Sequence, residues 1–169
     1  MTEVAIILTR FLIFLNGLLL SVFFAPALEK ISSVVMAADR CETSITVERM
    51  AAEFRSIRLI PGHFNGGPWN EEVDQWMGRK HKLMLELGSH LGRGECDKSQ
   101  ITGLLGPPDR IAHEGDHLFS LIISLPGYAA STGASYEFIV YFWRGMHDFM
   151  FFVSQDGMII SSDWWYAGD

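Results

Sequence analysis

The side chains best suited to bind a metal ion stand in two short segments. His113, Asp116 and His117 follow one another closely, and His147 stands beside Asp148 in a later segment. Zinc sites use about four ligands of these types, or three when the ion is catalytic. One interpretation is therefore a metal-dependent or acid–base enzyme built on these residues. It requires that the fold bring His147 to the first segment, and the competing interpretation is that all of them are loop or surface residues.

Other catalytic patterns are weaker. The glycine-rich segment 63–72 lacks the lysine and the serine or threonine of a phosphate-binding P-loop. The sequence contains no G-x-S-x-G nucleophile elbow. Asp148 and Asp163 flank an aromatic segment, but paired carboxylates catalyse hydrolysis in a cleft, which the sequence does not indicate. We therefore expect a protein that is not an enzyme and needs no cofactor.

The composition limits the class of partner. The chain has 169 residues, of which 49% are apolar, and its formal net charge is −7. This length and apolar content suit one hydrophobic core. An acidic chain without a basic run argues against nucleic-acid binding. We expect a single domain over residues 46–169 that does not bind nucleic acid.

Residues 1–28 have the composition of a secretory signal peptide or of a membrane anchor. Arg10 precedes an apolar run that ends in small residues resembling a cleavage site. If it is kept, the apolar segment 4–28 approaches the roughly 20 residues that span a bilayer. A buried helix of the domain is a third interpretation. The first two predict a protein of the cell envelope or of an organellar membrane complex, joined to its domain by a tether over residues 29–45.

Cys41 and Cys96 are the two cysteines of the chain. In an exported protein they could form one disulfide. Two buried free thiols would look the same in the sequence, so both alternatives stay open.

Apolar residues at helical spacing predict three helices. Thr46 is the expected cap of the first and Asn70 of the second, while Asp97 and Gln100 have the spacing of a capping box before the third. The alternating segment 117–125 predicts a strand. The predicted helices cover residues 47 to about 55, 71 to about 91, and 98–105.

Residues 136–166 are rich in β-branched and aromatic side chains and predict two consecutive β-hairpins. Asp156-Gly157 suits a two-residue turn, and Arg144-Gly145 is the expected earlier turn. The predicted pairs are Gln155–Met158, Val153–Ile160, Phe151–Ser162, Phe149–Trp164, Val140–Phe149 and Phe138–Phe151.

One face of this sheet is the predicted core, and it carries Tyr136, Phe138, Val140 and Phe142. The opposite face is just as apolar, whereas a face in contact with water is usually polar. Either another segment of the chain covers it, or it contacts a partner or a membrane. Large aromatic side chains contribute most to protein interfaces. The expected contact residues are Tyr141, Trp143, Phe152, Trp164 and Trp165.

Residues 98–109 read KSQITGLLGPPD and resemble the K-x-x-I/V-x-x-L-L-G-x-P-D segment of the SmpA/OmlA family, the BamE-like domains. The segment 156–159 and the late aromatic strand are also similar to that family's final strands. The resemblance extends over about residues 69–166. It implies two helices packed on a three- or four-stranded sheet. It also implies a non-enzymatic role at the bacterial cell envelope, assisting an outer-membrane protein assembly machine.

These observations predict an α+β fold, in which two or three helices pack on an antiparallel meander sheet after an N-terminal signal or anchor helix. The expected function is that of a binding or scaffold domain, exported or tethered to a membrane, that presents an aromatic sheet surface to a protein partner. The alternatives are the metal-dependent enzyme described above and an accessory subunit of a larger membrane complex.

Overall fold

Residues 41, 43–128 and 136–168 are described by the computed structural model. They belong to the second of two structural units of the chain, Arg40–Asp169. The predicted signal or anchor segment, residues 1–28, lies outside the described residues, as does most of the predicted tether. Of the helices that are described, none combines the length and apolar character required to cross a membrane.

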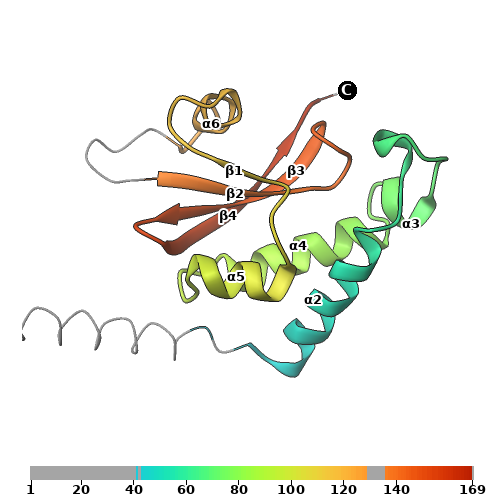
Figure 1. The fold of residues 1–169 in the computed structure, drawn as a ribbon, viewed down its shortest axis with the longest axis horizontal. Helices are drawn as coiled ribbons and strands as arrows, with labels where there is room; N and C mark the ends of the chain where they lie inside the picture. Colours follow the sequence, from blue (N-terminus) through green and yellow to red (C-terminus); the bar gives the residue numbers. More distant parts are fainter. Residues whose placement is uncertain (1–40, 42, 129–135, 169) are drawn as a thin grey trace, which may run out of the picture. The chain divides into compact units, whose positions relative to one another are not determined.

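Four antiparallel strands form one sheet in the order β1-β2-β3-β4 (Figure 1). They are β1 (Arg110–Ala112), β2 (Tyr136–Phe142), β3 (Asp148–Gln155) and β4 (Met158–Tyr166). The predicted α+β class and antiparallel meander are therefore confirmed. The short edge strand β1, which pairs with β2, was not predicted.

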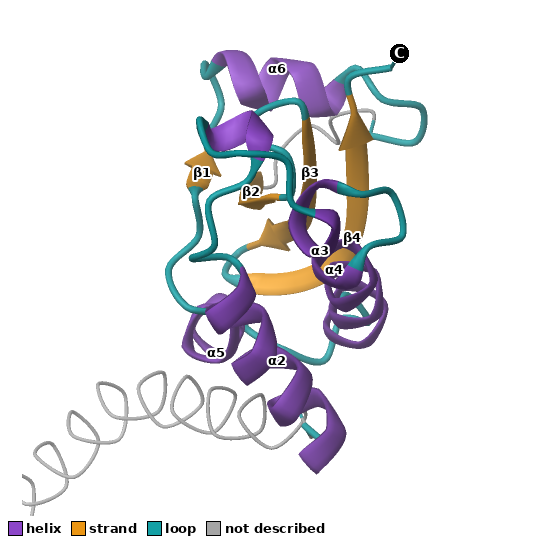
Figure 2. Cartoon of the chain, turned by 90° about the vertical axis from the view of Figure 1, so that its right-hand side faces the viewer, coloured by secondary structure: helices purple, strands orange, loops and turns teal. Residues whose placement is uncertain are grey.

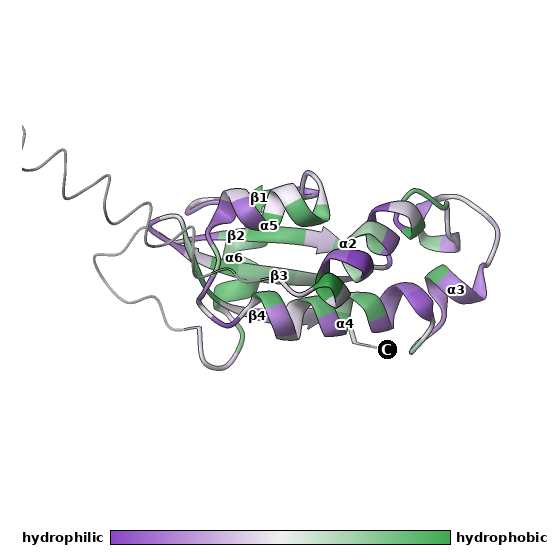
Figure 3. Ribbon diagram, turned by 90° about the horizontal axis from the view of Figure 1, so that it is seen from below, coloured by the Kyte–Doolittle hydropathy of each residue, from purple (hydrophilic) through white to green (hydrophobic). Residues whose placement is uncertain are grey.

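Three helices cover one face of the sheet (Figures 1 and 2). They are α2 (Ile45–Ile57), α4 (Arg79–Leu91) and α5 (Lys98–Leu105). Each helix turns an apolar stripe inward, because residues three or four positions apart share one side of a helix. Figure 3 shows apolar residues along the strands and on parts of these helices. The fully buried side chains of this core include Phe54, Met84, Leu87, Ile101, Leu105, Ile139, Tyr141, Met150 and Phe152.

The other face of the sheet is covered by α6 (His117–Ile123), so the predicted strand over residues 117–125 is wrong. Phe119 and Ile122 are buried three positions apart, and the Phe119 ring lies 5.0 Å from that of Phe138. Ser120 lies on the exposed side, where its hydroxyl donates to a helix carbonyl. The segment is apolar at most positions, so its sequence fits both the alternation of a strand and the spacing of a helix. The helix is the form in which Phe119 and Ile122 are buried together against the sheet.

Both faces of the sheet are thus covered by other described segments of the chain, so of the two alternatives for the second face, coverage by another segment holds and an exposed aromatic face does not. Tyr141 and Phe152 are fully buried and Trp143 is 1% exposed. These three residues lie beneath α2, α4 and α5, so they are core residues and not partner contacts.

The strand register differs from the prediction in both hairpins. Gln155 pairs with Met158 as expected, but a bulge follows between Val153 and Ser154. This shift of one residue exchanges the faces of Trp164 and Trp165, because successive side chains alternate. In the first hairpin the turn is longer than two residues, so each residue of β2 pairs with a residue of β3 two positions later than predicted. Because side chains alternate, a shift of two positions leaves every side chain on its predicted face. The observed pairs are Val153–Ser161, Phe151–Asp163, Phe149–Trp165, Val140–Phe151 and Phe138–Val153.

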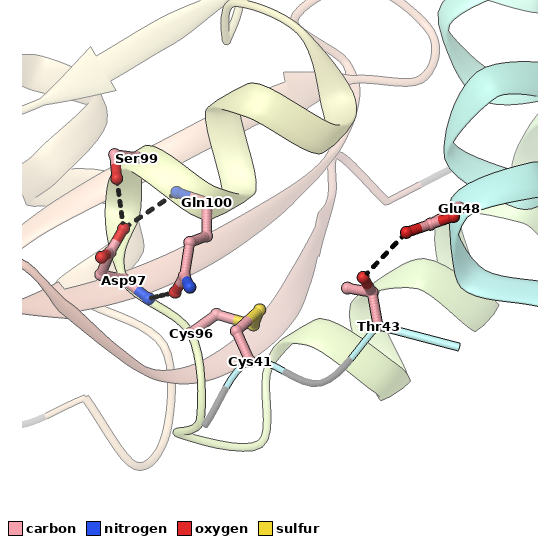
Figure 4. The surroundings of a disulfide bond; sticks show 7 residues. All are labelled: Cys41, Thr43, Glu48, Cys96, Asp97, Ser99 and Gln100. Carbon is pink, nitrogen blue, oxygen red and sulfur yellow. Dashed lines mark hydrogen bonds between the residues drawn. A yellow bond between two sulfur atoms is a disulfide. The ribbon is translucent and has the colours of Figure 1, made fainter. Parts of the chain in front are cut away.

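A disulfide joins Cys41 to Cys96 (Figure 4). It connects the residues that precede α2 to the loop between α4 and α5. The adjacent capping box of α5 forms as predicted: the Asp97 side chain accepts from the Gln100 backbone, and the Gln100 side chain accepts from the Asp97 backbone. The N-cap of α2 is Ser44, two residues before the predicted Thr46.

Candidate binding site

Three half-exposed aromatic rings surround an open pocket beyond the end of the β2–β3 hairpin. Phe64 is 37% exposed, Trp76 55% and Tyr166 39%, in contrast to the buried rings of the sheet. The pocket has a volume of about 370 Å³. We call it the aromatic pocket, and its lining residues are Phe64, Trp76, Arg144, His147, Asp148, Tyr166, Ala167 and Gly168.

Trp76 reaches the pocket because the predicted helix over residues 71 to about 91 is interrupted. It divides into α3 (Glu71–Asp74) and α4, with Gln75 in an extended conformation and Met77 at a positive φ of 59°. The backbone N–H of Met77 donates to Nδ1 of His81 at 3.1 Å instead of to a helix carbonyl. The interruption leaves Trp76 outside both helices, although the sequence predicted a continuous helix through it.

The broken end of α3 is completed by the β2–β3 connection. The indole Nε1 of Trp143 donates to the carbonyl of Val73, and Nε of Arg144 donates to the carbonyl of Asp74, each at 2.8 Å. The last carbonyls of a helix have no partner within the helix, so these two side chains supply the missing donors. Nζ of Lys80 in turn donates to the carbonyl of Trp143 at 2.8 Å. Three long-range hydrogen bonds thus fix one corner of the pocket.

Asp74 organises the loop that carries Phe64. Its buried carboxylate accepts from the backbone N–H of His63 at 2.9 Å and of Asn70 at 2.8 Å. Asn70 also caps α3, as predicted, by accepting from the backbone of Glu72. A carboxylate that accepts several backbone donors holds a loop in one conformation. The Phe64 ring is therefore presented by a fixed segment.

His81 lies fully buried beneath the pocket among four aromatic rings. Its imidazole stacks on Trp143, contacts Trp76 at a centroid distance of 4.5 Å and meets Trp164 edge-on. Its Nε2 lies 3.3 Å from the hydroxyl of Tyr166. Burial, aided by the charge of Arg144, lowers the pKa of His81 to about 4, so its ring is neutral near pH 7. His81 links the buried rings of the core to the exposed rings of the pocket.

The charges in the pocket are already paired. The Arg144 guanidinium lies 4.0 Å from the ring centroid of Trp143 and 5.4 Å from that of Phe64. Its Nη1 is 3.5 Å from Oδ2 of Asp148. Oδ1 of Asp148 accepts from the backbone N–H of Ala167 at 3.3 Å. The cation and the carboxylate thus stabilise one another inside the aromatic wall.

Trp164 and Trp165, the two remaining predicted contact residues, are partly buried on opposite faces of the sheet. Trp164 stacks on Tyr166, with ring centroids 5.4 Å apart, and so helps to fix the position of a ring that lines the pocket. Trp165 stacks on Phe149 on the α6 side and does not line the pocket.

The predicted metal ligands are not brought together. His113 and Asp116 are linked through the backbone of His113, whose N–H donates to the Asp116 carboxylate and whose carbonyl accepts from the Asp116 N–H, and not through the imidazole. His117 begins α6 with an exposed side chain. His147 lies in the β2–β3 connection, at the opposite end of β2 from the strand that precedes His113. In the described part of the chain, no three His, Cys, Asp or Glu side chains are grouped closely enough to hold a metal ion.

Sequence reasoning missed the three rings of the pocket. Phe64 lies in the glycine-rich segment 63–72, Trp76 lies within the predicted helix over residues 71 to about 91, and Tyr166 is the last residue of the predicted hairpins. The available signal was the loop itself, since large aromatic side chains in a segment rich in glycine have little core to enter. Their convergence depends on contacts between distant parts of the chain.

No family model, curated protein or solved structure matches this chain. The resemblance of residues 69–166 to the SmpA/OmlA domains therefore stays a prediction.

Proposed function

We propose that this chain is a non-enzymatic binding protein whose aromatic pocket receives part of a protein partner. The observation that carries the proposal is the exposure of Phe64, Trp76 and Tyr166 around one hollow, while the remaining aromatic rings of β2, β3 and β4 are buried or partly buried. Exposed apolar patches of this kind mark interaction sites. Trp and Tyr side chains are also the residues most enriched among those that dominate binding energy.

The hydrogen bonds that hold the residues around the pocket in place support the same proposal. Trp143 and Arg144 are hydrogen-bonded to α3, and Asp74 holds the loop of Phe64. A site held in one conformation loses little conformational entropy when a ligand binds. Of the catalytic candidates predicted from the sequence, the pocket lining includes His147 and Asp148 but not His113, Asp116 or His117, which favours binding over the metal-dependent alternative.

The proposed location is the cell envelope, with the domain exported or tethered through residues 4–28. The disulfide between Cys41 and Cys96 supports an oxidising compartment, because cytosolic thiols are normally kept reduced. The same pocket would serve an accessory subunit of a larger membrane complex, in an organelle or elsewhere. The two proposals differ in the partner and in whether the N-terminal segment is kept.

We retain membership of the SmpA/OmlA family as part of the proposal. The matching segment forms α5 and the turn after it. Arg58 donates to the carbonyl of Pro107 at 2.9 Å and pairs with Asp109, while the Tyr141 hydroxyl donates to the carbonyl of Gly106. These contacts give the motif residues a structural role in joining the helices to the sheet.

Site-specific photocrosslinking in the native host tests the binding function. A photoreactive phenylalanine analogue replaces Trp76 in one full-length variant and Trp69 in another. Both tryptophans are 55% exposed, but Trp69 does not line the pocket. We expect a discrete crosslinked protein from position 76 and much less of it from position 69.

Equal crosslinking at both positions, or none at either, would contradict the proposal. Mass spectrometry of the product identifies the partner. A product consisting of two copies of this chain would make the partner a second copy, and light scattering of the W76A variant would then report loss of the oligomer.

A further inference from the structure

Most of the polar side-chain groups that remain available in the aromatic pocket are hydrogen-bond donors. Because Nδ1 of His81 accepts from the backbone of Met77, the ring proton lies on Nε2 and points to the Tyr166 oxygen at 3.3 Å. The Tyr166 oxygen is thus an acceptor for His81, and its own proton is left to donate elsewhere. Burial raises the pKa of Tyr166 to about 12, so the hydroxyl keeps that proton at neutral pH.

Two further donors belong to residues that line the same pocket. Arg144 uses Nε for the Asp74 carbonyl and Nη1 for Asp148, which leaves Nη2 without a hydrogen-bond partner within the described residues. The indole N–H of Trp76 likewise has no acceptor among the described residues. The pocket therefore offers three donors from three separate elements.

Most acceptors around the pocket are already used, and the exposed imidazole of His147 is the lining side chain that can still accept a hydrogen bond. Both oxygens of Asp148 contact donors, Nη1 of Arg144 and the backbone N–H of Ala167. The nearby carbonyls of Asp74 and Trp143 accept from Arg144 and Lys80. A matching ligand therefore has several hydrogen-bond acceptors and few donors. A donor of the ligand that found no acceptor in the pocket would lose its hydrogen bonds to water without replacement, which weakens binding.

The charges of the pocket favour neither a cation nor an anion, because Arg144 and Asp148 offset one another. A cation would meet Arg144, which already occupies the faces of Phe64 and Trp143. An anion would approach Asp148 on a chain whose formal net charge is −7. The best match is therefore an occupant that is uncharged where it touches the pocket and carries apolar groups that pack on the exposed rings.

We infer that the aromatic pocket binds a proline-rich segment of the partner protein in the polyproline II conformation, an inference that rests on the proposed binding function. Proline has no backbone N–H and places an apolar ring beside an exposed carbonyl. Grooves lined by aromatic side chains bind such segments at low entropic cost, since the conformation is preformed. The Tyr166 hydroxyl, the Trp76 indole and Arg144 donate to its carbonyls, and the proline rings pack on Phe64, Trp76 and Tyr166.

The test uses the full-length protein in a mild detergent and an acetylated decaproline peptide as the probe. The control peptide has the same length and alternates glycine with serine. Titration calorimetry measures affinity, and the Trp76 indole N–H signal, assigned with the W76F variant, locates the site. We expect saturable binding of decaproline only, weakened about tenfold or more in W76A. Tyr166→Phe keeps the ring and removes the donor, and we expect a loss of about threefold to tenfold.

Trp69→Ala is the matched control, and its affinity for decaproline should stay within about twofold of the wild type. Equal weakening by W69A and W76A would overturn the inference, as would equal binding of the glycine–serine peptide or tighter binding of a decalysine peptide. Absence of decaproline binding, with crosslinking still specific to position 76, would overturn the proline-rich occupant and leave the binding function standing. Absence of both would overturn both.

Discussion

The imidazole of His81 stacks on the indole of Trp143, with ring centroids 4.1 Å apart and an angle of 13° between the planes. His81 belongs to α4 and Trp143 to the β2–β3 connection, so the stack joins the helical layer to the end of the hairpin. The same imidazole accepts from Met77 and contacts Trp76, which lines the aromatic pocket. The protonation of one buried ring is therefore coupled to the conformation of the pocket wall.

Acidification should destabilise the protein through His81. Its pKa lies near 6.5 in the unfolded chain and about 4 in the folded protein, mainly because of burial. Between these values the unfolded state binds the proton and the folded state does not. The free energy of unfolding therefore falls as the pH drops from 6.5 to 4, by up to about 1.4 kcal/mol per pH unit. Urea titrations at several pH values measure this slope.

The His81→Asn variant is the reference for this slope. Asparagine offers an acceptor for the Met77 N–H but does not titrate. Carboxylates contribute equally to both proteins, so the difference between the two slopes isolates His81. Identical slopes in the wild type and the variant would show that the imidazole is not buried in neutral form.

Replacing Trp143 by phenylalanine should remove a buried hydrogen bond and keep most of the ring packing. The Val73 carbonyl at the end of α3 would lose its donor. An unsatisfied buried carbonyl costs about 1–3 kcal/mol of stability. Chemical denaturation measures the loss, and Trp69→Phe, at an exposed position, should change stability by less than about 0.5 kcal/mol. Comparable losses in the two variants would contradict the capping role of Trp143.

Removing the disulfide should destabilise the domain without changing its fold. The bridge joins residues 55 positions apart, and closing a loop of that size restricts the unfolded chain. We expect the Cys41→Ala/Cys96→Ala variant to lose about 2–4 kcal/mol. Denaturation of the wild type with a reducing agent should give a similar loss. A reducing agent that leaves the wild-type midpoint unchanged would be inconsistent with a formed bridge.

Two glycines should respond in opposite directions to alanine. A Cβ at Gly92 would lie 2.3 Å from Oγ of Ser162 and 2.7 Å from its backbone nitrogen, so α4 and β4 would have to separate. A Cβ at Gly103, within α5, has nothing within 4 Å. We expect Gly92→Ala to lower stability by about 1–3 kcal/mol and Gly103→Ala to raise it by about 0.5–1 kcal/mol. Thermal unfolding separates the two, and a stabilising Gly92→Ala would disprove the close contact of α4 with β4.

Features that depend on near neighbours could be predicted from the sequence. The capping box of Asp97 and Gln100 and the two-residue turn that pairs Gln155 with Met158 both form as expected. Each involves groups within three or four residues, so the residue types alone carry the required hydrogen-bonding and backbone preferences. The antiparallel sheet followed in the same way from strands separated by short turns.

Contacts between distant residues decided the rest. The sequence alone determined that the C-terminal segment is an aromatic antiparallel sheet preceded by helices, and it offered the pairing of Cys41 with Cys96 as an alternative. Only the tertiary structure decided that α6 is a helix, that a bulge exchanges the faces of Trp164 and Trp165, and that Trp143 is buried while Trp76 is exposed. The physical reason is that an apolar residue type indicates that burial is favourable, because apolar surface is driven out of water, but it does not indicate which part of the fold will bury it. That part is supplied by helices and loops far away in the chain.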